Sequence, residues 1–355
     1  MRVSQWVPAA HAGDAIGDEA LRIREVLLTA GFDSDVYALT IDDEVQGVVK
    51  PFGGLGEMEP ADVTILHFAL PSPLTAAFRD ARGKKILIYH NITPATYFAG
   101  FDDELVRIAW MGREHLRELA PVADLALGDS EFNRQELEAE GFRKTGVFPI
   151  LIDFSRYDRP ASTVLSAMFD DDRSNFLFVG RVFPNKRFED LARLAFFYKK
   201  YVSENFRFTL VGKAGRMERY QESVEALAEH WGLRTAEFAF LGHVSWEELV
   251  ACYETADVFV SMSEHEGFSV PLVESMLFDV PILAYRAGAV PDTLGAAGVL
   301  FDEKNYDELA EMAHLLATDD RARDAVVRGQ QKRLEAFRPD RLEPELLRYV
   351  QEVLA

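Results

Sequence analysis

"ADVFVSMSEHEGFSVPLVESMLFDVPILAY", residues 256–285, contains two short apolar runs on either side of an acidic turn and a helical segment. The runs "ADVFVSM" and "DVPILAY" have the composition of buried strands. Pro271 between them suits the first turn of a helix. A strand, a helix and a second strand in this order predict a unit of a parallel sheet covered by helices. Glu264, Glu266 and Glu274 surround its strand-to-helix turn.

The same alternation of strand-length and helical patterns runs along nearly the whole chain. Strands are expected at 2–7, 33–39, 62–68, 84–90, 124–128 and 145–150, and again at 175–180, 206–212, 236–242, 257–262 and 280–285. The clearest helical patterns cover 17–31, 102–120, 187–204, 216–232 and 245–256. Residues 153–174 show no sustained period and are interpreted as a linker, and the tail from 306 is predicted to be helical with a break at 337–344. The pattern predicts two doubly wound α/β domains, which bind ligands beyond the carboxyl ends of their strands.

Composition limits the classes of partner. The 355 residues are 48% hydrophobic and 27% charged, as in a soluble globular protein of two domains. The net charge of −21 argues against nucleic acid as the main partner. No apolar run approaches the roughly 18 residues of a membrane span, so at most peripheral membrane contact is expected. The start lacks a signal peptide and the one cysteine, Cys252, cannot form an internal disulfide, so we expect a cytoplasmic protein.

Two cations follow a strand of the second half, in "VGRVFPNKRFEDL" (179–191). Arg181 comes directly after the strand and Lys186 lies near a helix start, a placement that could hold a diphosphate. Taken alone, Arg181 and Lys186 are explained equally well as two surface cations that bind no ligand. Gly212 follows the next strand, but neither a Walker loop nor a Gly-x-Gly-x-x-Gly motif is present there, which weakens a nicotinamide or flavin interpretation.

The acidic turn points to hydroxyl recognition. The amides at 267–269 precede a helix and would face a bound anion or hydroxyl groups. Glu266 and Glu274 offer carboxylate acceptors for the hydroxyls of a sugar or a ribose. The simpler explanation, that acids favour helix N-termini, covers Glu266 better than Glu274, which stands on an otherwise apolar helix. His90 ends an apolar strand, where an isolated histidine more often belongs to the core than to a catalytic site.

These motifs together resemble a known family. "EGFSVPLVE" (266–274) is similar to the Glu-x7-Glu signature of family 4 retaining glycosyltransferases with the GT-B fold, the glycosyl transferases group 1. "VGRVFPNKRFEDL" resembles their diphosphate motif, and 240–268 follows their usual order. The first half resembles them more loosely, through 13–39, 89–98 and 123–137. Their usual adjacent glycine pair is replaced here by "GDAIG" (13–17).

The resemblance implies roles for individual residues. Arg181 and Lys186 would stabilise the leaving diphosphate, Glu266 would bind donor-sugar hydroxyls, and His90 would face the donor sugar; these four are the implied catalytic residues. Glu274 would hold the ribose, while the backbone of His243 and Val244 would line the nucleobase pocket. The full donor-binding set implied is Gly13, Asp14, Gly17, Gly180, Arg181, Lys186, Gly212, His243, Val244, Glu266, Gly267, Phe268, Ser269, Val270 and Glu274.

The expected protein is therefore a GT-B glycosyltransferase with two Rossmann-like domains facing across a cleft. Residues 1–160 would bind the acceptor, 161–338 the nucleotide sugar, and a helix at 339–355 would cross back onto the first domain, with His90 facing Glu266 across the cleft. The expected reaction is retaining transfer of a hexose from a nucleoside diphosphate sugar to a glycan, lipid-linked or small-molecule acceptor in polysaccharide biosynthesis, with no cofactor and no metal. A GT-B sugar-nucleotide epimerase and a non-catalytic nucleotide-sugar-binding protein are the alternatives. Base, sugar, acceptor and oligomeric state are not specified by these motifs.

Overall fold

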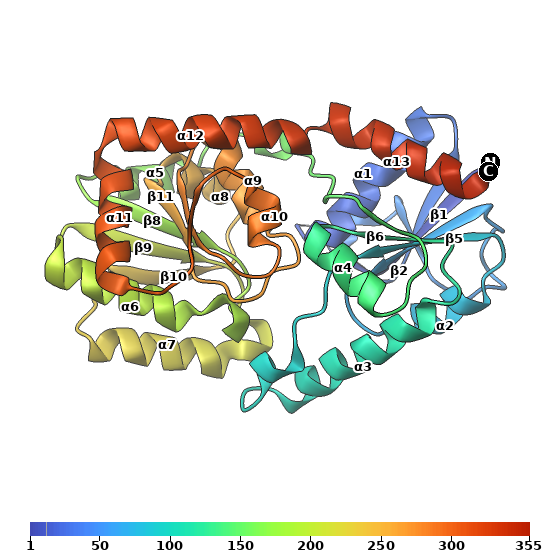
Figure 1. Cartoon of the computed structure of the whole chain (residues 1–355), viewed down its shortest axis with the longest axis horizontal. Helices are drawn as coiled ribbons and strands as arrows, with labels where there is room; N and C mark the ends of the chain where they lie inside the picture. Colours follow the sequence, from blue (N-terminus) through green and yellow to red (C-terminus); the bar gives the residue numbers. More distant parts are fainter. Residues whose placement is uncertain (12) are drawn as a thin grey trace. The chain divides into compact units, whose positions relative to one another are not determined.

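The computed structural model describes residues 1–11 and 13–355, which form two compact units (Figure 1). The N-terminal unit comprises Met1–Ala95, Glu104–Asp153 and Ala336–Ala355. The C-terminal unit comprises Thr96–Asp103 and Phe154–Glu335. Each unit contains its own parallel sheet, so the predicted fold class of two Rossmann-like α/β domains is confirmed.

A seven-stranded parallel sheet forms the centre of the N-terminal unit, in the order β3-β2-β1-β4-β5-β6-β7. Its strands are β1 (Arg2–Ala10), β2 (Asp33–Ile41), β3 (Val49–Pro51), β4 (Val63–Phe68), β5 (Lys84–Tyr89), β6 (Leu125–Gly128) and β7 (Thr145–Val147). The helices are α1 (Ala15–Thr29), α2 (Pro73–Asp80), α3 (Asp103–Leu119), α4 (Glu131–Ala139) and α13 (Pro339–Leu354), with short 3-10 turns at Asp43–Val45 and Ala95–Phe98.

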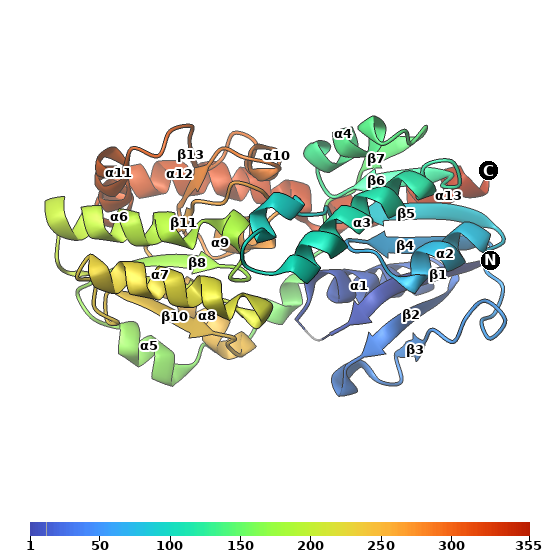
Figure 2. The ribbon, with the colours of Figure 1, turned by 90° about the horizontal axis from the view of Figure 1, so that it is seen from below.

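The last helix of the chain belongs to the N-terminal unit. α13 packs beside α1 on one face of the sheet, against β4 and β5, while α2 and α3 lie over the opposite face (Figures 1 and 2). Its Leu342, Leu346 and Val350 enter the same apolar core as Val63 and Ile86. Burial of this stripe, at roughly 25 cal/mol per Å² of apolar surface, holds the tail in place. The predicted return of the C-terminal helix to the first domain is confirmed.

The C-terminal unit contains a six-stranded parallel sheet in the order β10-β9-β8-β11-β12-β13. Its strands are β8 (Ser174–Val179), β9 (Phe206–Val211), β10 (Phe238–Gly242), β11 (Val258–Ser261), β12 (Ile282–Tyr285) and β13 (Val299–Phe301). Its helices are α5 (Thr163–Phe169), α6 (Phe188–Tyr201), α7 (Glu218–His230), α8 (Trp246–Glu254), α9 (Val270–Leu277), α10 (Val290–Leu294), α11 (Tyr306–Thr318) and α12 (Asp320–Leu334), with 3-10 turns at Phe154–Tyr157, Pro184–Lys186, Gly215–Met217 and Glu335–Phe337.

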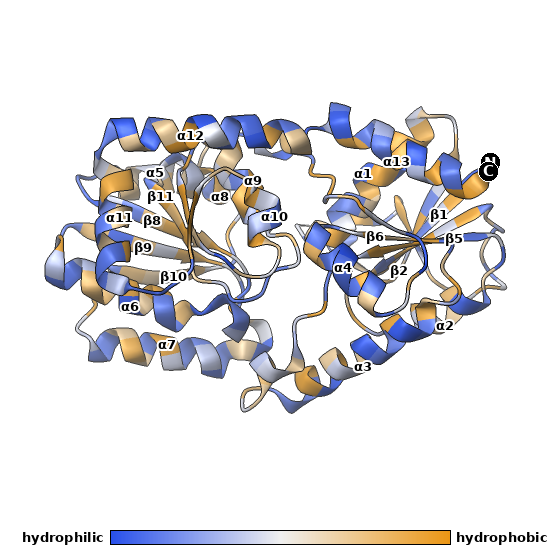
Figure 3. Cartoon of the chain, viewed as in Figure 1, coloured by the Kyte–Doolittle hydropathy of each residue, from blue (hydrophilic) through white to orange (hydrophobic). Residues whose placement is uncertain are grey.

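Burial follows the expected layering of the C-terminal unit. The strands are mostly hydrophobic and α12 is mostly hydrophilic (Figure 3). α6 and α7 cover one face of the sheet, and α8, α9 and α12 cover the other (Figures 1 and 2). Aromatic side chains fill the space between β8, β9 and α6, where Phe176 packs edge-on against Tyr198 with ring centroids 4.9 Å apart. No helix in the described part of the chain is long and apolar enough to cross a membrane.

Both sheets reverse their strand order at one point. In the N-terminal unit β1 and β4 are neighbours, and in the C-terminal unit β8 and β11 are neighbours although β9 and β10 separate them in sequence. The connections that follow such a pair run to opposite faces of the sheet, which leaves a crevice beyond the strand ends where ligands bind. The segments after β8 and β11 contain Lys186 and Glu266, so the topology brings these two residues together.

Two local predictions were wrong. The segment 153–174, interpreted as a linker because it shows no sustained period, contains the 3-10 turn Phe154–Tyr157 and α5, and from Phe154 onward it belongs to the C-terminal unit. α5 is too short to show a period, and Ser162 caps it by accepting a hydrogen bond from the Leu165 N–H. The break expected over 337–344 instead covers the 3-10 turn Glu335–Phe337 and the N-cap Arg338: α13 starts at Pro339, a good first helical residue, and continues through Pro344.

Candidate active site

Glycines bring the ends of three strands of the C-terminal unit close together. The Gly212 N–H donates to the Gly242 carbonyl at 2.8 Å, and a side chain at Gly212 would overlap the Gly180 carbonyl. Gly212 also has φ 147. The close approach of β8 and β9 therefore explains Gly212 without a ligand. Arg181 is exposed directly after Gly180.

Lys186 and Glu266 form an ion pair. The Lys186 Nζ lies 2.5 Å from the Glu266 Oε2, and the two side chains are 18% and 7% exposed. Lys186 ends the 3-10 turn after β8, and Glu266 lies in the segment between β11 and α9. The ammonium group has three N–H donors, so Lys186 can keep Glu266 while donating to phosphate oxygens. The carboxylate has spare lone pairs for hydroxyl groups.

Backbone contacts fix the segment that carries Glu266. The Glu264 N–H donates to the Asn185 carbonyl at 2.8 Å, and the Asn185 side-chain amide donates to the His265 carbonyl at 2.9 Å. On the other side the Ala289 N–H donates to the Glu266 carbonyl at 2.9 Å. Gly288, at φ 53, lies so close to the Glu266 backbone that a side chain would clash with it. Asn185 and Gly288 were missed in the sequence, because their partners are about 80 and 20 positions away.

The N-terminus of α9 comes shortly after Glu266 in the chain. Gly267 is half-buried and Phe268 is buried, and Ser269 is the N-cap with a left-handed φ of 74. A positive φ is uncommon for serine and costs on the order of 1 kcal/mol or more, which the surrounding contacts must offset. Val270 begins the helix and Pro271 occupies its first turn, as predicted. The helix start thus lies next to Glu266, where its N–H groups favour an anion or hydroxyl oxygens.

Glu274 is buried one turn inside α9, and both of its oxygens already accept hydrogen bonds. Tyr253 on α8 donates to Oε2 at 2.6 Å, and Tyr157 donates to Oε1. Burial raises the pKa of this carboxyl, while the tyrosine hydroxyls act in the opposite direction. Each carboxylate oxygen can accept a second hydrogen bond, so the contacts leave capacity for a ribose diol. The two tyrosines had no recognisable sequence signal.

His243 and Val244 lie in the turn between β10 and α8. His243 is exposed and Val244 is half-buried. Ser245 ends the turn with a capping box, in which its hydroxyl accepts from the Glu248 N–H and the Glu248 carboxylate accepts from the Ser245 N–H. The capping box fixes where α8 begins and therefore the path of the turn.

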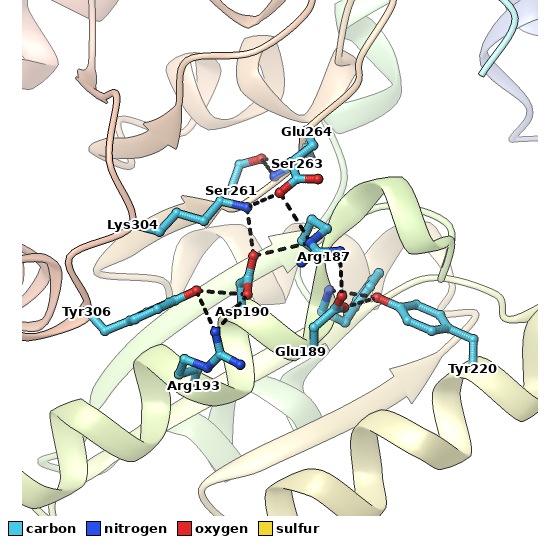
Figure 4. A network of polar contacts seen from close by, with 11 residues as sticks. Arg187, Glu189, Asp190, Arg193, Tyr220, Ser261, Ser263, Glu264, Lys304 and Tyr306 are labelled. Atoms are coloured by element: carbon cyan, nitrogen blue, oxygen red, sulfur yellow. Dashed lines mark hydrogen bonds and ion pairs between the residues drawn. The ribbon is translucent and has the colours of Figure 1, made fainter. Parts of the chain in front are cut away.

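A partly buried charge network holds Glu264 at the side of this site (Figure 4). Lys304 donates to the Glu264 carboxylate at 2.8 Å and to the Asp190 carboxylate at 2.7 Å. Arg187, at the start of α6, lies 3.3 Å from both carboxylates, and the Tyr306 hydroxyl donates to Asp190 at 2.8 Å. Burial would raise the pKa of Asp190, but Lys304, Tyr306 and Arg187 lower it. The network joins α6, the 263–269 segment and the start of α11.

A segment from the first half of the sequence also packs in the C-terminal unit. Phe98 meets Phe183 edge-on at 5.4 Å between ring centroids, and Phe101 meets Tyr220 at 5.3 Å. Asp102 accepts hydrogen bonds from Arg216 at 2.6 and 3.2 Å. Phe183 lies in the turn that carries Lys186, so residues 96–103 support that turn although the sequence places them before α3.

The predicted site residues of the N-terminal unit lie at the ends of β1 and β5. Gly13 has φ 78 in the turn before α1, and Asp14 is the N-cap. Gly17 is buried inside α1, where an added methyl group would just touch Ala10 and His11 at 3.4 Å. His90 directly follows β5, and its side chain is only 3% exposed. Its Nδ1 lies 3.0 Å from the Asp129 carboxylate and its Nε2 lies 3.0 Å from the His67 Nδ1.

Part of the chain is similar in sequence to known proteins. Residues 166–333, within the C-terminal unit, match the family model described as glycosyl transferases group 1. A GDP-mannose-dependent alpha-mannosyltransferase of Mycobacterium tuberculosis is 26% identical over 279 residues, which are 75% of this chain and 68% of the relative. The O-antigen chain mannosyltransferase B of Escherichia coli is 28% identical over 43% of this chain and 39% of its own length.

Solved structures resemble the whole chain in fold. HepE from Anabaena in complex with UDP-glucose is 16% identical, with a TM-score of 0.76 over 99% of this chain and 100% of that chain. The sucrose-phosphate synthase from Thermosynechococcus elongatus is also 16% identical, with a TM-score of 0.75 and 99% of each chain covered. At this identity the likeness concerns the fold.

Proposed function

We propose that this chain, whose residues 166–333 match the glycosyl transferases group 1 model, transfers a hexose from a nucleoside diphosphate sugar, with retention of anomeric configuration, to a hydroxyl group of a glycan, lipid-linked or small-molecule acceptor. The observation that carries the proposal is the Lys186–Glu266 pair at the switch point between β8 and β11. It places a cation and a hydroxyl acceptor side by side where a ligand of such a sheet binds.

The proposed chemistry is stabilisation of the leaving group. The bond between the anomeric carbon and the donor phosphate oxygen breaks, and the diphosphate gains negative charge. Arg181 and Lys186 would oppose that charge, with the N-terminus of α9 nearby. The acceptor oxygen forms the new bond on the same face of the sugar, and its proton passes to the departing phosphate oxygen. Since these charges are met by side chains, we propose that no metal or other cofactor is needed.

The remaining predicted residues would bind the donor. We propose that Glu266 accepts hydroxyls of the sugar, with Gly267, Phe268, Ser269 and Val270 beside it. Glu274 would accept the ribose hydroxyls through the lone pairs that its two tyrosine partners leave. His243 and Val244 would line the nucleobase by their backbone. The packing at Gly180 and Gly212 supports only an indirect role for these glycines, through the shape of the strand ends.

The N-terminal unit would complete the donor site. We propose that the turn of Gly13 and Asp14 approaches the diphosphate, and that Gly17 keeps the first turn of α1 free of side-chain bulk. His90 would act on the sugar side of the donor. That His90 faces Glu266 across a closing cleft stays a prediction, as does a cytoplasmic location.

We propose mannose as the transferred sugar, because the GDP-mannose-dependent enzyme and the O-antigen enzyme are both named mannosyltransferases. The test incubates the protein with GDP-mannose, UDP-glucose, ADP-glucose or TDP-glucose and a mixture of glycan and lipid-linked acceptors. Release of GDP, and a product whose anomeric NMR couplings match those of the donor, support the proposal. Interconversion of the nucleotide sugar without transfer indicates an epimerase. Binding without turnover indicates a sensor or scaffold.

A further inference from the structure

Four polar side chains form a continuous hydrogen-bonded line through the N-terminal unit. The Gln5 Oε1 on β1 lies 3.0 Å from the His67 Nε2 on β4, and the His67 Nδ1 lies 3.0 Å from the His90 Nε2. The line ends at the Asp129 carboxylate, 3.0 Å from the His90 Nδ1. Gln5 and His67 are fully buried, and the His90 and Asp129 side chains are at most 3% exposed.

The partners at the two ends determine where the protons are. The Gln5 amide N–H donates to the Ala20 carbonyl at 2.9 Å, so the Gln5 oxygen is an acceptor and the His67 Nε2 must carry a hydrogen. Asp129 is likewise an acceptor for a hydrogen on the His90 Nδ1. A neutral imidazole has only one N–H. If both rings were neutral, two bare lone pairs would face each other across the 3.0 Å between the His67 Nδ1 and the His90 Nε2.

With Asp129 ionised, one of the two rings must carry a second proton, and the surroundings select His90. Burial opposes the charge, but Asp129, Glu19 and Asp14 outweigh it and raise the pKa of His90 to about 9. Burial and the charge of His90 hold the pKa of His67 well below its ordinary value. Burial raises the pKa values of Glu19 and Asp129, and the charge of His90 counteracts it at both.

A shared metal ion is the competing explanation, because Glu19, His67 and His90 lie close enough together to hold one. The ring geometry decides against it. The two rings are parallel within 2° and their centroids are 5.2 Å apart, about as far as the 3.0 Å N···N contact allows. The nitrogens therefore point at each other in line, as in an N–H···N hydrogen bond. Two metal ligands would instead converge on a point toward Glu19, whose Oε2 is 3.7 Å from His90 and 3.8 Å from His67.

We infer that His67 is a positioning residue, which accepts a hydrogen bond from a doubly protonated His90 and, with Asp129, holds that ring as a fixed buried cation. His90 then has no lone pair and cannot take the proton of the acceptor. It can act only as a positive charge of fixed orientation, which agrees with the proposed transfer of that proton to the leaving phosphate. The importance of His67 for turnover rests on the proposed function, whereas the protonation state does not.

Nitrogen-15 NMR of the histidine-labelled protein tests the protonation state without any turnover. We expect both ring nitrogens of His90 to have imidazolium shifts throughout the range of about pH 5–8 in which an ordinary histidine titrates, and His67 to remain neutral. The variant Asp129→Asn keeps an acceptor but removes the charge, and should make His90 neutral at the upper end of this range. A neutral His90 at pH 7 in the wild-type protein would overturn the inference. So would a stoichiometric metal ion that a chelator removes with a change in both histidine signals.

A matched pair of variants tests the positioning role. His67→Gln retains a side-chain oxygen that can accept from His90, and His67→Leu does not. We expect His67→Leu to lower kcat/KM about ten- to a hundredfold, by analogy with the loss of a partner that orients a metal-bound histidine, and His67→Gln to recover most of it. The exposed His230→Gln is the control. If the Gln and Leu variants lose the same amount of activity and the His90 nitrogen shifts are unchanged in both, the role of His67 is contradicted. If the Leu variant fails to fold, the His90 shifts of the wild-type protein still test the protonation state.

Discussion

The Lys186 ammonium group lies 2.5 Å from the Glu266 carboxylate. The residue predicted to bind the leaving diphosphate therefore forms an ion pair with the residue predicted to bind the sugar. The pair is largely desolvated, and removing one partner of such a pair leaves the other with an uncompensated charge. Donor binding would have to keep this contact while adding phosphate oxygens on one side and hydroxyls on the other. The pair therefore connects binding of the diphosphate and binding of the sugar to one geometry.

The first prediction concerns the two cations of the C-terminal unit. Arg181→Ala and Lys186→Ala should each lower kcat/KM roughly ten- to a thousandfold, on the order of the loss of one transition-state hydrogen-bond donor. Lys213→Ala, an exposed cation after β9, is the control and should keep its activity. Steady-state kinetics measure the effect. Wild-type turnover in both test variants would remove these residues from the site.

The second prediction separates the two possible duties of Glu274. Glu274→Gln should weaken binding of the free nucleoside diphosphate by about ten- to a hundredfold, since a hydrogen bond to a charged acceptor contributes about 1.5–3 kcal/mol. Tyr253→Phe removes one partner but keeps the carboxylate, and should lower the Tm with little change in affinity. Titration calorimetry and thermal unfolding give both values. A lower Tm with unchanged nucleotide affinity in Glu274→Gln would mean that the residue is structural.

Protonation of His90 predicts how stability depends on pH. Its pKa is raised from the ordinary value of 6.5 to about 9, so its stabilising contribution is fully present below pH 6.5 and is lost as the pH rises through 9. The raised pKa of Glu19 acts in the same direction. We expect the Tm to fall between these two pH values, and the fall to begin at lower pH in Asp129→Asn. A Tm that rises over this interval would contradict a buried His90 cation.

The fourth prediction concerns the returning helix. Leu346 on α13 is 1% exposed in the core of the N-terminal unit, and Leu346→Ala should destabilise the protein by about 2–5 kcal/mol. Leu315→Ala, on the exposed side of α11, should stay close to the wild type. Deletion from residue 339 onward should be more severe, because it exposes the whole apolar stripe. Denaturant unfolding of the three variants measures the differences, and a mild deletion would show that α13 is dispensable for this core.

The last prediction is that transfer proceeds without a divalent metal. Excess EDTA should leave the initial rate unchanged, since Arg181, Lys186 and the α9 start are proposed to meet the diphosphate charge. Sodium chloride added to the same ionic strength is the control. A rate that disappears with EDTA and returns with Mg²⁺ or Mn²⁺ would show that a metal ion carries part of that charge.

The sequence by itself determined the elements and the residues that follow them. Strands such as 63–68 and 258–261 are short, mostly apolar runs rich in β-branched residues, and their identity depends only on near neighbours in the chain. The N-cap of α4 is local in the same way, since the Ser130 side chain accepts a hydrogen bond from the Asn133 N–H. The three-residue strands β3 and β13 and the helix α5 were missed because they are too short to show a period.

Tertiary structure decided which of these residues meet. Lys186 and Glu266 are 80 positions apart and come together because β11 pairs with β8 rather than with β10. Strand order likewise explains why two tyrosines meet Glu274. It also explains the hydrogen-bonded line that runs from Gln5 through His67 and His90 to Asp129. Periodicity is a property of a few adjacent residues, whereas these contacts depend on the order in which strands pack. That order is set by the burial of apolar faces from the whole chain, so no local pattern contains it.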